Sequence, residues 1–265
     1  MEPLVSVIIP VFNSGKYVSE TLQSVTDQTY QNIEVVIVDN GSTDELTIKL
    51  LQEFKTQYKL ILSEQVDVST IRNKAIDAAT GTFILPLDSD DLIESTFIEK
   101  CVKAFQENPS IKLVRTYVEL FGERKGEMPL AEYSYSLLLA RNLMVVTSMF
   151  RRNDWEAIGG FDPKYAAAFE DWEFWINLLK EDGKVHTIKE PLFKYRIRRN
   201  SRNHTTKLEV FIEAREKIWE KHKEQFAIHY VNPLETFEYQ FIANSKANKL
   251  GSILLSPFSR FKLIK

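Results

Sequence analysis

The first ninety residues alternate between short runs of apolar, mostly β-branched residues and longer segments with apolar residues at helical spacing. The short runs are typical of buried strands, and the longer segments are typical of amphipathic helices. Strands are expected at residues 5–9, 33–38, 59–62 and 83–85, and helices at residues 16–28, 45–57 and 69–79. Because helices separate successive strands, the pattern predicts βαβ crossovers and an α/β fold with a mainly parallel sheet flanked by helices.

Beyond residue 95 the pattern is looser. Helices are expected at 96–106, 172–179, 205–226 and 233–250, strands at 112–120 and 143–150, and a polar loop at 121–129. At about 150 residues per domain, 265 residues correspond to slightly less than two domains. We therefore expect one α/β domain over residues 1–204 and a C-terminal helical extension over residues 205–265.

Three polar clusters follow expected strands, at residues 10–13, 39–44 and 88–91. In an open parallel sheet, ligands bind outside the carboxyl ends of the strands. The same residue types are preferred in turns and helix caps, so loop formation alone is the alternative interpretation. The third cluster holds three carboxylates within four residues, and such groups repel one another unless a cation is present. Carboxylates favour Mg²⁺ or Mn²⁺, and such an ion typically neutralises a phosphorylated substrate.

Composition and motifs exclude several classes of protein. The chain has 34 basic and 37 acidic residues and a net charge of −3, without the basic excess expected for nucleic-acid binding. Neither GxGxxG after the first strand nor GxxxxGK[ST] is present, which argues against dinucleotide-linked dehydrogenases and P-loop NTPases. The single cysteine, Cys101, favours a reducing compartment. No apolar run approaches about 18 residues and residues 1–5 lack a signal pattern, so we expect a cytoplasmic protein.

Several short motifs occur in order along the chain: Ser6–Asn13, Leu22–Val25, Gln28–Tyr30, Glu34–Asp44, Arg72–Ala75, Gly81, Leu87–Asp91, Gly159–Asp162 and Phe169–Glu173. Taken together, they resemble family 2 inverting glycosyltransferases. The resemblance covers roughly residues 4–200, and the order of the motifs makes it specific. One departure is Asn40, which stands where the family usually has a second Asp.

The resemblance implies a GT-A fold, with a nucleotide-binding part at about 1–92 and an acceptor-side part at about 93–204. It implies transfer of a sugar from a nucleoside-diphosphate sugar, a UDP-sugar being expected, to an acceptor hydroxyl with inversion at the anomeric carbon. A divalent metal, Mn²⁺ or Mg²⁺, would bind the donor diphosphate. The expected acceptor is a glycan or a lipid-linked molecule in surface polysaccharide or glycolipid biosynthesis.

The resemblance also assigns roles to residues. Asp171, beside Glu170, is the expected catalytic base, and the positive end of its helix should favour the ionised form. Asp90 is the expected main metal ligand, with Asp88 nearby and His204 completing the shell. The remaining donor contacts are expected from Pro10, Phe12, Asn13, Asp39, Arg72, Asp88, Ser89, Arg196 and Arg199.

Each assignment has a structural alternative. Asp88 and Asp90 could cap a helix beginning near Leu92, a role that we assign to Asp91. Asp39 could form an Asx turn toward Gly41. Arg72 could be an exposed helical arginine, and the basic stretch 194–202, which holds five cations, could be a solvated surface rather than a diphosphate-binding loop.

Two other functions share some of these features. A sugar nucleotidyltransferase shares the sheet and the metal, but it would need a glycine-rich basic loop after the first strand, and residues 10–15 do not provide one. A non-catalytic nucleotide-sugar-binding module would not need to keep both acidic motifs. Residues 246–265 combine five cations with eight apolar residues and no acid, so they could contact an anionic membrane peripherally, or pack on the protein or on a second subunit.

Overall fold

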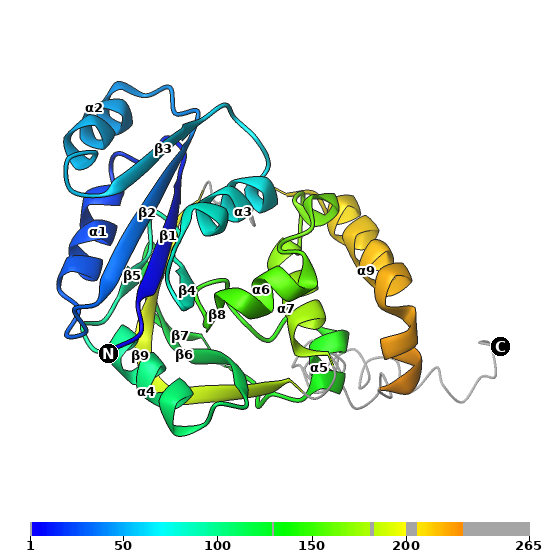
Figure 1. Ribbon diagram of the computed structural model, residues 1–265. Helices are drawn as coiled ribbons and strands as arrows, with labels where there is room; N and C mark the ends of the chain where they lie inside the picture. The colour runs from blue at the N-terminus through cyan, green and yellow to red at the C-terminus, as the bar shows by residue number, and fades with distance from the viewer. Residues whose placement is uncertain (1, 129, 181–182, 200–205, 230–265) are drawn as a thin grey trace, which may run out of the picture.

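The computed structural model describes residues 2–128, 130–180, 183–199 and 206–229, which form an α/β fold around one curled sheet (Figure 1). Within these residues nine strands join in the order β3-β2-β1-β4-β8-β6-β9-β5, with β7 paired to β6. The strands are β1 (Val5–Val11), β2 (Ile33–Asn40), β3 (Lys59–Ser63), β4 (Phe83–Pro86), β5 (Leu92–Ile93), β6 (Ile111–Gly122), β7 (Gly126–Met128), β8 (Met149–Arg151) and β9 (Lys184–Ile197).

The first four strands form the parallel part of the sheet. β1 lies between β2 and β4, and β3 pairs with β2, all in parallel. Beyond β4 the sheet becomes mixed, because β8 runs antiparallel to both β4 and β6, whereas β6 and β9 are parallel. The first half therefore has the predicted βαβ topology, with its strand ends at one edge.

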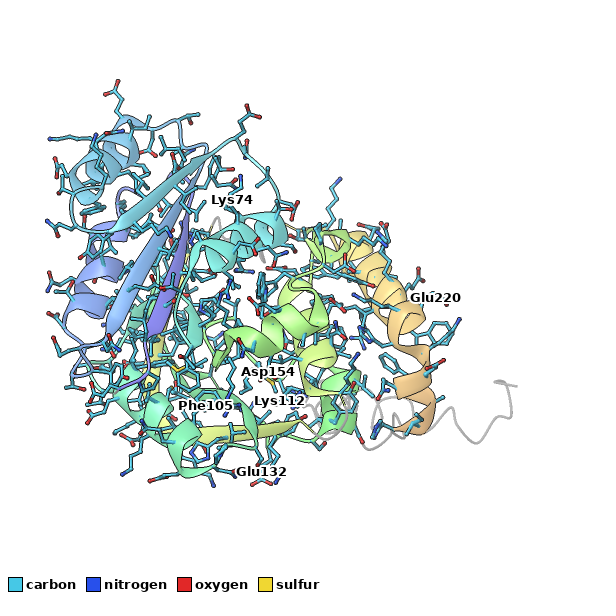
Figure 2. All side chains as sticks on the ribbon, in the orientation of Figure 1. Lys74, Phe105, Lys112, Glu132, Asp154 and Glu220 are labelled. Atoms are coloured by element: carbon cyan, nitrogen blue, oxygen red, sulfur yellow. The ribbon has the colours of Figure 1, made fainter. Side chains whose placement is uncertain are left out.

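Helices cover both faces of the sheet. α1 (Val18–Thr26), α2 (Glu45–Phe54) and α4 (Phe97–Glu107) contribute buried residues to the same core cluster as Val7 and Ile9 of β1. Ile8 points to the opposite cluster, which contains residues of α3 (Val68–Ala78), α5 (Tyr135–Ala140), α6 (Arg152–Ile158) and α7 (Glu170–Leu179). In Figure 1, α1 and α2 accordingly lie on one side of β1 and α3, α6 and α7 on the other. An ion pair of 3.7 Å between Lys112 of β6 and Asp154 of α6 adds a polar contact between sheet and helix (Figure 2).

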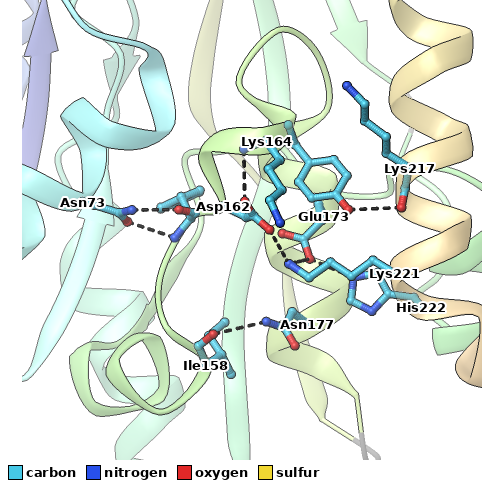
Figure 3. Close-up of polar contacts among 11 residues, drawn as sticks. Asn73, Ile158, Asp162, Lys164, Glu173, Asn177, Lys217, Lys221 and His222 are labelled. Carbon is cyan, nitrogen blue, oxygen red and sulfur yellow. Dashed lines mark hydrogen bonds and ion pairs between the residues drawn. The ribbon is translucent and has the colours of Figure 1, made fainter.

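The last described helix, α9 (Leu208–Ile228), packs beside α7 (Figure 1). Its Ile218 is fully buried in the same cluster as the α7 side chains. Figure 3 shows polar contacts between the two helices: Glu173 Oε1 lies 2.7 Å from His222 Nε2 and 2.8 Å from Lys221 Nζ. The described part of the extension is therefore anchored on the α/β domain.

Most predicted elements occur within a few residues of their expected bounds. The predicted strand 143–150 is wrong for most of its length, because β8 spans only Met149–Arg151. The predicted loop 121–129 contains β7, which forms a hairpin with β6. The helix expected at 233–250 lies outside the described residues. No helix in the described part of the chain has the length and apolar character needed to cross a bilayer.

Candidate active site

The ends of β1, β2, β4 and β9 surround a cavity of about 350 Å³. Parallel strands place their carboxyl ends at a common edge, and this edge brings the predicted polar clusters together. The lining residues with candidate roles are Pro10, Phe12, Asn40, Asp88, Ser89, Asp90, Arg196 and Arg198. Acidic and basic side chains thus share one concave site, which we call the donor cavity after the role that the sequence predicts for these residues.

A second cavity, of about 500 Å³, adjoins the first. Arg72, Asp88 and Tyr195 line both cavities, and Glu170 and Asp171 line only the second. We call the second the acceptor cavity, because it holds the residue that the sequence predicts as the catalytic base. Its volume lies in the range typical of ligand sites, about 300–1,000 Å³. The two expected catalytic regions, far apart in sequence, therefore meet in adjoining spaces.

Arg72 connects the two regions. Its guanidinium is 3% exposed and lies 3.0 Å from Asp88 Oδ1 and 2.8 Å from Glu170 Oε1. The two carboxylates raise the pKa of Arg72 although burial opposes this, so it stays charged. The alternative of an exposed helical arginine is excluded. In this structure, Arg72 fixes the acidic cluster after β4 against the start of α7.

Two arginines at the end of β9 contact the acidic cluster, residues 88–91. Arg198 lies 2.6 Å from Asp90 Oδ2, and the Arg196 side chain donates to the Asp90 carbonyl at 2.7 Å. Burial and the nearby charge of Asp88 raise the pKa of Asp90, and both arginines oppose that shift. The arginines therefore lie where they partly neutralise the cluster.

Asp91 has a different role from the predicted one. β5 occupies residues 92–93 and α4 begins only at Phe97, so Asp91 caps no helix and that prediction is wrong. Its buried carboxylate accepts the Arg196 backbone N–H at 2.8 Å. Burial, with the charges of Asp90 and Asp88, raises the pKa of Asp91 well above its usual value. Asp91 holds β9 against the cluster.

Asp171 occupies the first turn of α7 and lines the acceptor cavity. Its Oδ2 accepts from Asn142 Nδ2 at 3.0 Å, and its Oδ1 accepts from the Trp172 backbone N–H at 2.8 Å. Burial and the charge of Glu170 nevertheless raise the pKa of Asp171 to about 6, against the opposing effects of Arg72 and these two donors. The Trp172 N–H at the start of the helix does lower the pKa of Asp171, but burial and Glu170 outweigh it, so the net shift is opposite to the one that the sequence predicts.

The loops after β1 and β2 are held by their own polar side chains. Asn13 Oδ1 accepts the backbone N–H groups of Thr43 and Asp44, at 2.8 and 3.1 Å. Asp39 Oδ1 accepts the Ser42 N–H at 3.0 Å, one residue beyond the Gly41 N–H that an Asx turn would use, so Asp39 has a local role in the loop of the kind considered as its alternative. Asn40 bonds both the N–H and the carbonyl of Val66, at 2.8 and 2.9 Å. An amide side chain donates and accepts in this way, whereas an ionised aspartate only accepts, so these two hydrogen bonds explain why Asn stands at position 40 where the family usually has Asp.

The other predicted residues differ in how close they lie to the donor cavity and the acidic cluster. Asn13 and Asp39 support the donor cavity without lining it. Arg199 is 89% exposed and lies 3.5 Å from Glu123, away from the acidic cluster. His204 falls outside the described residues. The sequence interpretation missed Asn142 and Tyr195, because each comes close to the site only through the fold.

Asn73, which follows Arg72 in sequence, has a structural function of its own. Asn73 donates to the Phe161 carbonyl at 2.7 Å and accepts its N–H at 2.9 Å (Figure 3). Gly160 has φ +76°, and a Cβ there would lie 2.7 Å from Asn73 Oδ1. Asn73 thus ties α3 to the Gly159–Gly160 turn, while its neighbour Arg72 ties α3 to α7.

A family model described as glycosyl transferase family 2 matches residues 6–172, more than half of the chain. The chain belongs to this family. Chondroitin synthase of Escherichia coli is 28% identical over 195 residues, which are 71% of this chain but only 28% of that protein. The whole-protein activity of that relative therefore does not transfer directly to this chain.

Solved structures show the same fold. S. aureus TarS 1–349 in complex with UDP-GlcNAc matches with a TM-score of 0.70 and 20% identity, covering 93% of this chain and 77% of TarS. The mannosyltransferase PcManGT from Pyrobaculum calidifontis, in complex with GDP-Man and Mn²⁺, matches with a TM-score of 0.61 and 19% identity. That match covers 100% of this chain and 82% of PcManGT. The fold is GT-A, and the chain is a glycosyltransferase.

A divalent metal ion in this site would have to be held by the carboxylates of the donor cavity. Among the described residues, no three His, Cys, Asp or Glu side chains gather as a self-sufficient metal site. Asp88 and Asp90 do line the same cavity. Mg²⁺ bound with nucleotides is commonly held by one or two carboxylates and by the substrate phosphates, so this pair fits a metal that binds together with its donor.

Proposed function

We propose that the protein transfers a sugar from a UDP-sugar to an acceptor hydroxyl with inversion at the anomeric carbon. The observation that carries this proposal is the pair of adjoining cavities. One holds carboxylates and arginines suited to a diphosphate, and the other holds a carboxylate suited to act as a base. A single displacement requires these two chemistries on opposite sides of one reacting carbon.

On the donor side, Arg196 and Arg198 supply positive charge for the diphosphate. Their present partners are Glu20, at 2.5 Å from Arg196, and Asp90, at 2.6 Å from Arg198. Asp88 and Asp90 would hold a divalent ion, Mn²⁺ or Mg²⁺, whose charge would stabilise the leaving diphosphate. Arg198 would then exchange Asp90 for a phosphate oxygen, because guanidinium groups bind phosphate in the same fork geometry as carboxylate.

On the acceptor side, Asp171 accepts the proton of the attacking hydroxyl. A pKa of about 6 leaves most of this carboxylate ionised at neutral pH while keeping it basic enough to take a proton. Asn142 and the Trp172 N–H orient its two oxygens. Glu170 lines the same cavity, but its carboxylate is paired with the buried Arg72 guanidinium, so we assign it to positioning Arg72 rather than to accepting the proton.

A UDP-sugar is the proposed donor because the family resemblance assigns Asp39, at the end of β2, to the N–H of a uracil ring; Asp39 stands beside the donor cavity without lining it. TarS and PcManGT were solved with donors that differ in their base, so the shared fold does not decide this point. Chondroitin synthase builds a polysaccharide according to its name, which supports a glycan or lipid-linked acceptor in polysaccharide biosynthesis. Peripheral membrane contact through residues 246–265 stays a proposal from sequence and lies outside the described residues.

The test is release of nucleoside diphosphate from a panel of UDP- and GDP-sugars, with Mn²⁺, with Mg²⁺ and with chelator. We expect a UDP-sugar to be consumed with a divalent ion present. Asp171→Asn should keep donor affinity and lose about two to four orders of magnitude in turnover, the range that general bases contribute. Release of pyrophosphate from a nucleoside triphosphate and a sugar phosphate would instead identify a nucleotidyltransferase, and full turnover of Asp171→Asn would contradict the role of Asp171.

A further inference from the structure

Two phenylalanines, one just before α7 and one on α9, lie together on the wall of the acceptor cavity. Phe169 precedes α7 and Phe211 belongs to α9, and both are half-buried. Their ring centroids are 5.2 Å apart and their planes are tilted by 46°. Phe211 lies beyond residues 6–172, so the family model does not cover it. The acceptor cavity is therefore completed by a residue of the C-terminal extension.

The backbone and a neighbouring ring fix the position of Phe169. It has φ 65° and ψ 25°, a left-handed conformation that is a genuine outlier for a bulky side chain. The ring of the buried Trp172 packs edge-on against the Phe169 ring, with 5.1 Å between the ring centroids. Trp172 is itself held by its indole N–H, which donates to the Leu138 carbonyl at 2.6 Å. Residues held in such strained conformations cluster at active sites and ligand clamps. The ring stands two residues before the proposed base.

Helix α9 is held at a definite distance from α7, which fixes Phe211. The buried pair Glu173–His222 joins the two helices (Figure 3). The hydroxyl of Tyr165, which precedes α7, also donates to the Lys217 carbonyl of α9 at 3.1 Å. Nearer to Phe211, Arg215 donates to the Ala140 carbonyl at 3.0 Å and lies over the Trp172 ring. The two phenylalanines thus form a preorganised surface, which we call the aromatic platform.

We propose that the aromatic platform binds the pyranose ring that carries the attacking hydroxyl of the acceptor. The inference rests on the proposed function, because that hydroxyl must come within hydrogen-bond reach of Asp171. The ring bearing the hydroxyl must then lie in the acceptor cavity, beside Phe169. A pyranose has a face of C–H groups that packs on an aromatic ring, whereas an open-chain polyol has no such flat face. The platform therefore selects a sugar ring as the accepting group.

The test uses a panel of methyl pyranosides as acceptors, with glycerol and ribitol as open-chain comparisons. Glycosyl transfer and hydrolysis of the donor by water are measured in the same reactions. Phe211→Ala should raise the KM for the pyranoside about three- to tenfold, the value of one aromatic contact. The ratio of transfer to hydrolysis should fall by a similar factor, and Phe211→Tyr should restore both.

Ile212→Ala is the matched control. Ile212 follows Phe211 on the same helix, is 48% exposed and does not line the cavity, so its replacement should leave both the KM and the ratio unchanged. The inference is overturned if Phe211→Ala behaves like Ile212→Ala, if the open-chain polyols are used as well as the pyranosides, or if the wild type hydrolyses donor but glycosylates no pyranoside. A wild type that releases no nucleoside diphosphate from any donor would contradict the proposed function itself, which is a different result.

Discussion

Replacing Arg72 with leucine should destabilise the protein far more than replacing any surface arginine. The guanidinium is 3% exposed and contacts two carboxylates, of which the Glu170 side chain is only 2% exposed and that of Asp88 is 36% exposed. Removing one partner of a buried ion pair typically costs about 3–5 kcal/mol, because the other charge stays buried without compensation. Glu170 accounts for most of that cost, since water can still reach Asp88.

The assay is urea unfolding followed by circular dichroism, with Arg72→Leu compared with Arg152→Leu. Arg152 lies 2.5 Å from Glu156, but the side chains are 27% and 45% exposed, and such a pair contributes about 1 kcal/mol or less. Adding Glu170→Gln to Arg72→Leu should recover part of the lost stability, because the uncompensated charge is removed. Equal losses in Arg72→Leu and Arg152→Leu, or no recovery in the double variant, would refute this explanation.

Two further predictions concern the proposed base and the Gly159–Gly160 turn at the end of α6. Asn142→Ala removes a hydrogen bond that favours the ionised form of Asp171, so the pKa of Asp171 should rise above about 6 and the acid limb of the kcat/KM–pH profile should move to higher pH. The control is Asn177→Ala, because Asn177 lies on α7 but donates to the Ile158 carbonyl, so its replacement should leave that limb in place. An unmoved limb in both variants would contradict the role of Asn142. Gly159→Ala should cost about 1–2 kcal/mol from its positive φ alone. Gly160→Ala should cost more in the same urea assay, because the added Cβ would also lie 2.7 Å from Asn73 Oδ1, and equal costs would show that this contact relaxes freely.

The first half of the fold follows from local pattern. The strands β1 and β2 are β-branched runs buried on both faces, and the helix between them, α1, has a clear apolar stripe. Sequence periodicity therefore predicts both kinds of element. The acidic cluster also stands out, because three close carboxylates are costly without a cation or arginine partners. Asp88 and Asp90 were therefore visible as a candidate site before any tertiary contact was known.

Residues whose role depends on tertiary contacts were not predictable in the same way. Asn142 approaches Asp171 across 29 positions of sequence, and Phe211 approaches Phe169 across 42. Arg199 lies in the same basic stretch as Arg198, yet only Arg198 turns toward Asp90, since the direction of each side chain depends on where β9 ends. Local composition cannot distinguish these cases.

The stereochemistry of the product tests the central claim most directly. Wild-type protein is incubated with an α-linked UDP-sugar, a divalent ion and a methyl pyranoside, and the configuration of the new glycosidic bond is determined by proton NMR. A single displacement assisted by Asp171 on the acceptor side predicts a β-linked product with release of UDP. An α-linked product would require a different mechanism and would contradict the assignment of Asp171 as the base.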